Sequence, residues 1–100
     1  MKADKVLDQF CGELASSINE SLPTFEGHDL RADAGESGMI YVALRGAKKK
    51  TDLGESLAER IAAIADEIIA AEDHPIDFAI SMGRGNKDLL LQVECRVVGG

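Results

Sequence analysis

The sequence predicts a single α+β domain over residues 1–100, with two helices packed on one face of a four-stranded, mainly antiparallel sheet. Two stretches repeat apolar residues at three- and four-residue steps, which is typical of amphipathic helices. Two other stretches alternate apolar and polar residues around a glycine-containing turn, which is typical of β-hairpins. Along the chain these patterns give the order α-β-β-α-β-β.

The first half of the chain carries one helix and one hairpin. Residues 3–20 place their apolar side chains on a single stripe, and Pro23 and Gly27 mark its end and a short connection. Between 28 and 45 the period changes to two, on either side of a turn at 35–38. The stripe of the helix consists of Val6, Leu7, Phe10, Cys11, Leu14 and Ile18.

The second half repeats this arrangement. Residues 52–72 carry a stripe of leucine and isoleucine, and Asp52 with Glu55 resembles a capping box at its start. His74-Pro75 ends the helix. Alternating runs at 76–82 and 89–98, joined by a turn at 83–87, predict the second hairpin.

Charge and composition restrict the function classes. The chain has 18 acidic and 11 basic residues and a formal net charge of −7, which disfavours general binding to nucleic acid or to anionic lipid. It has neither an export signal nor an apolar stretch long enough for a membrane span, so we expect a cytoplasmic protein. In that compartment Cys11 and Cys95 are expected to be buried reduced thiols, because a disulfide between them would need oxidising conditions.

Motifs of catalysis are missing from the sequence. There is no nucleophile elbow, no phosphate-binding loop and no paired-cysteine motif. His28 and His74 have no metal-ligand spacing, and neighbouring acids such as Asp66-Glu67 and Glu72-Asp73 point apart on a helix. We therefore expect a protein that is not an enzyme and that needs no cofactor and no metal.

The sheet face turned away from the helices is the first candidate site. Small and semi-apolar residues surround one tyrosine there, which favours an interface with a protein partner, most simply a second copy of the chain. An ordinary solvated sheet face is the alternative. The candidate partner-binding residues are Tyr41, Ala43, Ala79, Ser81, Leu90 and Gln92.

Two basic loops form the second candidate site. Because the helix at 52–72 returns along the sheet, the turn at 83–87 is expected at the same end as the 46–51 connection. Together with the start of that helix, the loops could hold a phosphate-bearing ligand such as a nucleotide or an RNA end. Exposed loops that only solvate the protein are the alternative. The candidate anion-binding residues are Arg45, Lys48, Lys49, Lys50, Arg84 and Lys87.

The C-terminal Gly99-Gly100 provides a third possibility. Residues 28–100 have the order β-β-α-β-β and end in two glycines, which resembles ubiquitin-like and sulfur-carrier proteins of the β-grasp type. The resemblance implies a terminal carboxylate that a partner enzyme adenylates and that is then thiolated or conjugated. The helix at 3–20 departs from that family. In architecture alone, a small acidic dimer of this kind also resembles bacterial secretion chaperones.

Overall fold

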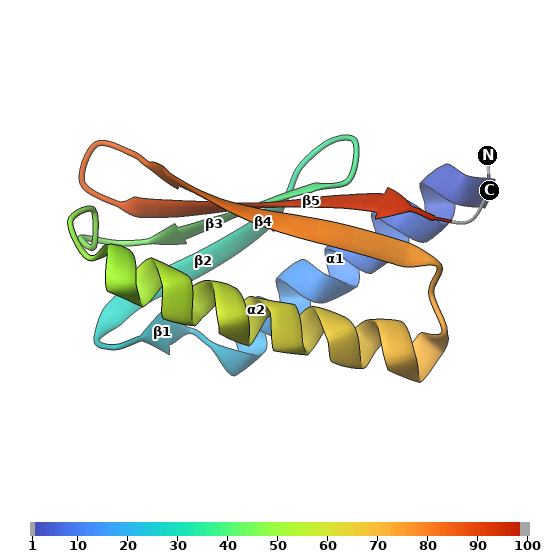
Figure 1. Cartoon of the computed structure of the whole chain (residues 1–100), viewed down its shortest axis with the longest axis horizontal. Coiled ribbons are helices and arrows are strands. Elements are labelled where there is room, and N and C mark those ends of the chain that lie inside the picture. The colour runs from blue at the N-terminus through green and yellow to red at the C-terminus, as the bar shows by residue number, and fades with distance from the viewer. Residues whose placement is uncertain (1, 99–100) are drawn as a thin grey trace.

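Two helices and five strands follow one another along the part of the chain that the structure describes (Figure 1). This computed structural model describes residues 2–98, and within them the side chains of residues 5–83 and 85–98. The α+β class predicted from the sequence is confirmed. The elements are α1 (Lys2–Ser21), β1 (Thr24–Phe25), β2 (His28–Ala34), β3 (Met39–Leu44), α2 (Thr51–Glu72), β4 (Ile76–Arg84) and β5 (Leu89–Val97).

The sheet has five strands in the order β1-β2-β3-β5-β4, and each neighbouring pair is antiparallel. The prediction of four strands was therefore wrong by one. The additional strand, β1, is only two residues long and pairs with the start of β2 across the turn Glu26-Gly27. Both turn residues have positive φ, 51° and 83°, as a tight two-residue hairpin requires. Two residues are too few to show an alternating pattern in the sequence.

The start of α2 also differs from the prediction. Lys50, not Asp52, is the N-terminal cap, and within the described residues it makes no side-chain capping hydrogen bond. The capping box of Asp52 and Glu55 is therefore not the device that starts this helix. The chain is already turning before it, because Lys50 N donates to Ala47 O at 2.9 Å. Asp52 lies in the first turn, where its charge complements the positive end of the helix dipole.

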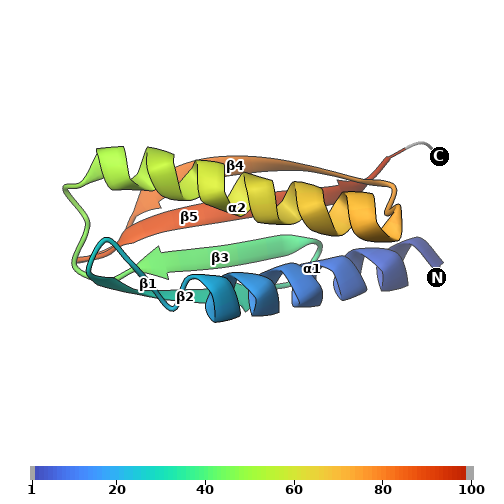
Figure 2. The same ribbon diagram turned by 90° about the horizontal axis from the view of Figure 1, so that it is seen from below.

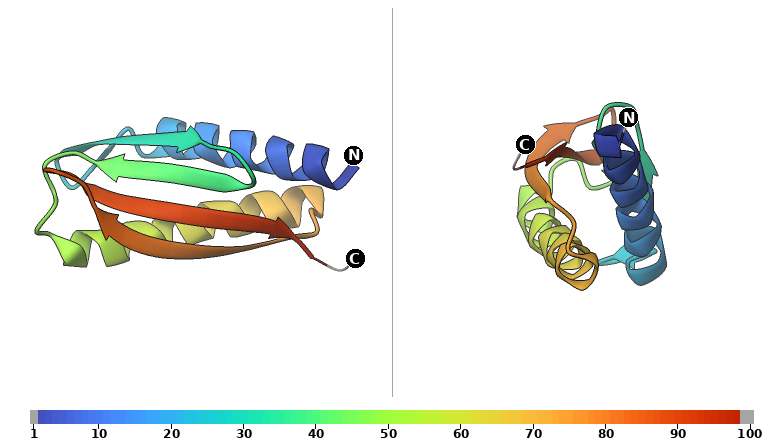
Figure 3. Two further views of the ribbon diagram at one scale, coloured as in Figure 1. Left: turned by 90° about the horizontal axis from the view of Figure 1, so that it is seen from above. Right: turned by 90° about the vertical axis from the view of Figure 1, so that its right-hand side faces the viewer.

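Both helices lie against the same face of the sheet, and the core fills the space between the two layers. Seen from below, α1 and α2 lie side by side in front of the strands (Figure 2). Seen from above, the strands are in front, and no helix of the described chain lies over their other face (Figure 3). The largest fully buried side chains come from α1, α2, β3 and β5: Phe10, Leu14, Ile18, Leu57, Ile61, Ile40, Val42, Leu44, Leu89, Leu91 and Val93.

The two edges of the sheet are finished differently. On the side of β1, which covers only the start of β2, the rest of the outer edge of β2 is open to α1. There the Asn19 side chain pairs with the backbone of Ala32 as a further strand would. Its Nδ2 donates to Ala32 O at 2.8 Å, and its Oδ1 accepts from Ala32 N at 2.8 Å. Leu30 N next to it donates to Pro23 O at 3.1 Å. The other edge is β4, which is not followed by another strand in the described sheet.

Candidate functional site

The uncovered face of the sheet brings the predicted partner-binding residues together. In the register of the sheet, Tyr41 lies opposite Gln92, which lies opposite Ser81 on β4. The neighbouring row pairs Ala43 with Leu90. Ala79, the sixth predicted residue, adjoins these rows on β4, so the candidate residues form one continuous patch on three strands.

Apolar side chains on this patch are exposed to solvent. Tyr41 is 49% exposed and Leu90 is 36% exposed. With Gln92 and Met82 they line a hollow of about 300 Å³. The alternation of β4 places Met82 toward the helices, yet it is 42% exposed because β4 is the edge strand. This hollow therefore lies over β3, β5 and the edge strand β4, with mainly apolar residues in its lining.

Charged residues lie on the same face as this patch, and four of them form two ion pairs. Arg31 Nε lies 3.2 Å from Asp33 Oδ2 on β2, and Arg96 Nη2 lies 3.2 Å from Asp77 Oδ2 across β4 and β5. All four side chains are more than half exposed. The face thus carries two internally compensated ion pairs. The exposed Glu94, opposite Ala79 on β4, adds a carboxylate that forms no ion pair among the described residues.

The basic loops lie side by side at one end of the molecule. Lys48 N donates to Lys87 O at 3.2 Å, and Gly46 N donates to Asp88 Oδ1 at 3.1 Å, so hydrogen bonds join the two loops. A hollow of about 500 Å³ lies between them. Its lining includes Lys48, Lys49, Lys50 and Lys87. Arg84 is the last residue of β4, and its side chain lies outside the described side chains.

His28 forms a hydrogen bond with Lys50, one of the lysines of the basic loops. The Nδ1 atom of its ring lies 2.8 Å from Arg45 O, an acceptor, so Nδ1 carries the proton and donates. Nε2 is then free to accept from Lys50 Nζ at 3.3 Å. Lys50 is therefore partly engaged within the chain, whereas Asp52 and Asp88 add negative charge at this end.

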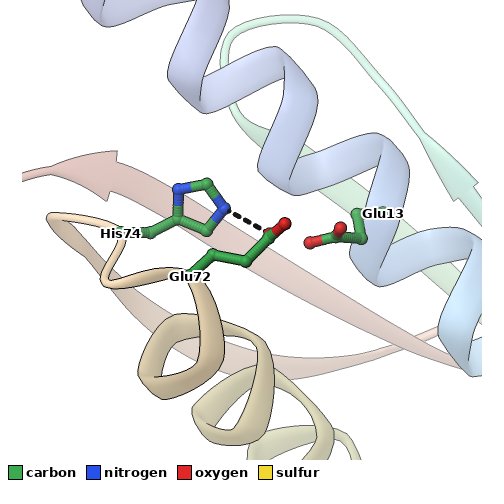
Figure 4. Close-up of side chains that lie close together, drawn as sticks. All are labelled: Glu13, Glu72 and His74. Atoms are coloured by element: carbon green, nitrogen blue, oxygen red, sulfur yellow. Dashed lines mark hydrogen bonds and ion pairs between the residues drawn. The ribbon is translucent and has the colours of Figure 1, made fainter.

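A third cluster was not predicted from the sequence. Glu13 of α1, Glu72 at the end of α2 and His74 just after it point toward one another (Figure 4). His74 Nε2 lies 2.8 Å from Glu72 Oε2, and one ligand atom from each of the three residues lies within 4.8 Å of the others. Glu13 is 59 positions from Glu72, so spacing along the sequence gave no sign of the cluster.

The two carboxyl groups of this cluster influence each other. Hydrogen bonding to Glu72, which Glu13 can offer only as the protonated acid, raises the pKa of Glu13, and burial adds to the effect. The same contact, together with the hydrogen bond from His74, lowers the pKa of Glu72. As an ionised group, Glu13 keeps a buried Oε2 atom with no hydrogen-bond partner among the described residues.

The two cysteines lie within the core and contact each other. Cys11 on α1 and Cys95 on β5 are buried, and both are free thiols. A hydrogen bond between them lowers the pKa of Cys11 and raises the pKa of Cys95. Because both thiols are buried, they are not part of the sheet face or of the basic loops.

Comparison with known proteins gives no family for the chain. No protein-family model, curated protein or solved structure matches it significantly. In the described part of the chain, neither helix is both long and apolar enough to span a bilayer. Gly99-Gly100 lies outside the described residues, and the chain is still tied to the sheet at Val98, whose N–H donates to Pro75 O at 2.8 Å.

Proposed function

We propose that the chain is a non-enzymatic protein-binding module that forms a homodimer through the uncovered face of its sheet. The exposed Tyr41, with Leu90 and Gln92 beside it on a face that no described helix covers, is the observation that carries this proposal. Exposed apolar side chains gathered on an uncovered sheet face mark a site where another chain can bind, and the same patch on two copies gives a two-fold interface.

The size of the face supports a dimer. The longest and shortest extents of the molecule are 39 and 18 Å, and the view from above looks onto that area (Figure 3). The rectangle that encloses the molecule in this view is about 700 Å², of the same order as the roughly 800 Å² of surface that each partner contributes to a stable interface of standard size. The charged residues around Tyr41 and Leu90 would form the polar rim that such interfaces usually have.

Tyr41 accounts for a large share of the expected affinity. A fully buried aromatic side chain removes about 150–250 Å² from water, so covering the exposed half of Tyr41 removes about 100 Å² per subunit. At about 25 cal/mol per Å² this contributes roughly 2–3 kcal/mol from each copy. A carboxylate in its place would be desolvated close to its symmetry mate, at a cost of several kcal/mol.

Sedimentation velocity over a concentration series tests the proposal. The wild type is expected to be dimeric at micromolar concentration, Tyr41→Phe to remain dimeric, and Tyr41→Glu to be monomeric with an unchanged circular dichroism spectrum. Ser56→Glu adds the same charge to the exposed surface of α2 and should leave the dimer intact. A wild type that stays monomeric at high micromolar concentration contradicts the proposal.

A further variant distinguishes the face from the edge of the sheet. In the register of β4, the backbone of Ile80 points away from β5, so Ile80→Pro removes a donor from the free edge and leaves the ladder intact. If Ile80→Pro dissociates the dimer and Tyr41→Glu does not, the copies pair edge to edge, and the proposed interface is wrong.

The joined basic loops favour anion binding as a second candidate function. Four lysines line one hollow beside a helix start without a side-chain cap, where backbone N–H groups can donate hydrogen bonds to a phosphate. We expect salt-sensitive chemical-shift changes around 45–52 and 83–88 when a nucleotide or a short RNA is added. The variant with Lys48, Lys49 and Lys50 replaced by Ala should lose them. If no signal moves at low salt, these lysines only solvate the loops.

The carrier function implied by Gly99-Gly100 is tested separately, because it predicts a covalent change. The intact mass of protein purified from its own host would reveal a thiocarboxylate or a conjugate. We expect an unmodified C-terminus. A modification that is lost on deletion of Gly100 would replace the dimer proposal by that of a carrier.

A further inference from the structure

Three side chains that can ligate a metal converge where the C-terminal end of α2 meets α1. We propose that Glu13, Glu72 and His74 bind one divalent transition-metal ion of the zinc type, which ties the two helices together. Figure 4 shows the two carboxylates facing one another with the imidazole ring beside them. This site lies within one chain, and it is distinct from the sheet face through which we propose that copies associate.

The distances fit an ion after small side-chain movements. Zinc lies about 2.0–2.2 Å from nitrogen and carboxylate oxygen ligands, so two ligand atoms on a tetrahedral ion are about 3.4 Å apart. The present atoms lie within 4.8 Å of one another, and the closest pair, Nε2 of His74 and Oε2 of Glu72, is 2.8 Å apart. An ion entering between them replaces the proton that Nε2 donates to Oε2 and releases it to water or to Nδ1, separates that pair slightly and draws the third ligand closer. The Glu72 side chain is 42% exposed, so it has the most room of the pair to move.

One of the three ligands is held in place by packing, and a second has a buried oxygen without a partner. The His74 ring packs edge-on against Phe10, with ring centroids 5.8 Å apart and an interplanar angle of 73°. Its side chain is only 11% exposed. The Oε2 atom of Glu13 is buried without a hydrogen-bond partner among the described residues, and the Glu13 carboxyl group faces the cluster. A buried acceptor of this kind calls for a donor or a cation, and an ion in the cluster supplies one.

The surrounding charge attracts a cation. The last turn of α2 contains no basic residue, so the partial negative charge of the helix C-terminus is not compensated from its own helix. Asp73, the C-terminal cap in the left-handed conformation, adds a further carboxylate next to Glu72. Two facing carboxylates, a helix C-terminus and a neighbouring acid all favour positive charge at this point.

The donor set selects the class of metal. Calcium and magnesium prefer oxygen ligands alone, whereas an imidazole nitrogen with carboxylates suits zinc and its neighbours in the transition series. Three protein ligands leave a coordination position for water. A hollow of about 300 Å³ beside the cluster, lined in part by Glu13, Ser17 and Glu72, gives that water room. Because the ion joins α1 to the end of α2, we assign it a stabilising role.

Zinc titration of the chelator-treated full chain tests the site. By calorimetry we expect one Zn²⁺ per chain, and by thermal unfolding an increase in Tm of about 10 °C or more once free Zn²⁺ is about 100-fold above Kd. Mg²⁺ at the same concentration should have no effect. Glu13→Gln and His74→Gln should each weaken zinc binding by about 100-fold, at least as much as loss of an outer-shell partner does. Glu20→Gln on α1 and His28→Gln, which change the same residue types elsewhere, should bind as the wild type does.

Cobalt distinguishes this site from the buried thiols. Co²⁺ bound by two carboxylates and an imidazole shows ligand-field bands without an intense thiolate-to-metal transition, whereas binding at Cys11 and Cys95 would show that transition. The Tyr41→Glu variant should bind the same amount of zinc, because all three ligands belong to one chain. The proposal is overturned by a thiolate transition, by zinc affinity weaker than millimolar, or by undiminished binding to a folded Glu13→Gln variant.

Discussion

Removing the amide of Asn19 should destabilise the fold although the residue lies on the outside of α1. Asn19 closes the β2 edge by donating to Ala32 O and accepting from Ala32 N, both at 2.8 Å. Asn19→Ala therefore leaves two backbone groups of a residue that is only 2% exposed without their partners. Backbone groups that water cannot easily reach lose most when their partner is removed.

The expected size of the effect follows from these two bonds. Each hydrogen bond contributes about 0.5–1.5 kcal/mol net, so the pair contributes about 1–3 kcal/mol. Alanine regains up to about 0.7 kcal/mol through its higher helix propensity. We expect a net loss of about 1–2 kcal/mol in the free energy of unfolding, which lowers the Tm of a domain of this size by about 5–15 °C.

Urea unfolding monitored by circular dichroism measures this loss, and hydrogen exchange of the Ala32 amide locates it. Glu20→Ala, at the next and exposed position of the same helix, serves as the control and should change the free energy of unfolding by less than about 0.5 kcal/mol. Asn19→Asp keeps the acceptor for Ala32 N but places a carboxylate oxygen against Ala32 O, so it should not restore stability at neutral pH. An Asn19→Ala variant as stable as Glu20→Ala would refute the role of Asn19 as an edge clamp.

Two further predictions concern helix glycines and pH. The methyl group of Gly12→Ala on α1 would meet no atom within 4 Å, so this variant should stabilise the fold by about 0.5–1 kcal/mol. Gly54→Ala should lack this gain, because its methyl group would lie 2.8 Å from a Cδ atom of the buried Leu89. Thermal unfolding of the two variants in parallel measures the difference, and equal stabilisation would contradict the close contact. In chelator, the stabilisation that protonated Glu13 provides is fully present below the ordinary glutamate pKa of 4.5 and is lost as the pH rises through its raised value. The opposite holds for Glu72, whose lowered pKa adds stability above 4.5 that is lost on further acidification. In the Glu13→Gln variant, the free energy of unfolding should therefore fall less steeply above pH 4.5 than in the wild type. If the free energies of unfolding of wild type and variant differ by the same amount at every pH, the contact between the carboxyl groups is contradicted.

The elements themselves could be predicted from the sequence because their causes are local. An apolar stripe at helical spacing, or strict alternation around a glycine-containing turn, is a property of consecutive residues, and it predicted both long helices and all four long strands. β1 was missed because two residues carry no period and pair only once the Glu26-Gly27 turn has closed. The start of α2 was misplaced because a turn that begins at Ala47, not a side-chain cap, starts the helix.

Of the candidate sites, one could be predicted from the sequence and others depend on tertiary packing. The face of each residue in a strand is fixed by parity, so the patch around Tyr41 could be assembled from the sequence before the order of the strands was known. The Asn19 clamp and the cluster of Glu13, Glu72 and His74 could not, because each joins residues that only tertiary packing brings into contact. Local sequence thus determined the elements and their faces. The packing of α1 against β2 and against the end of α2 decided which polar side chains meet, because burial between layers selects partners without regard to their separation along the chain.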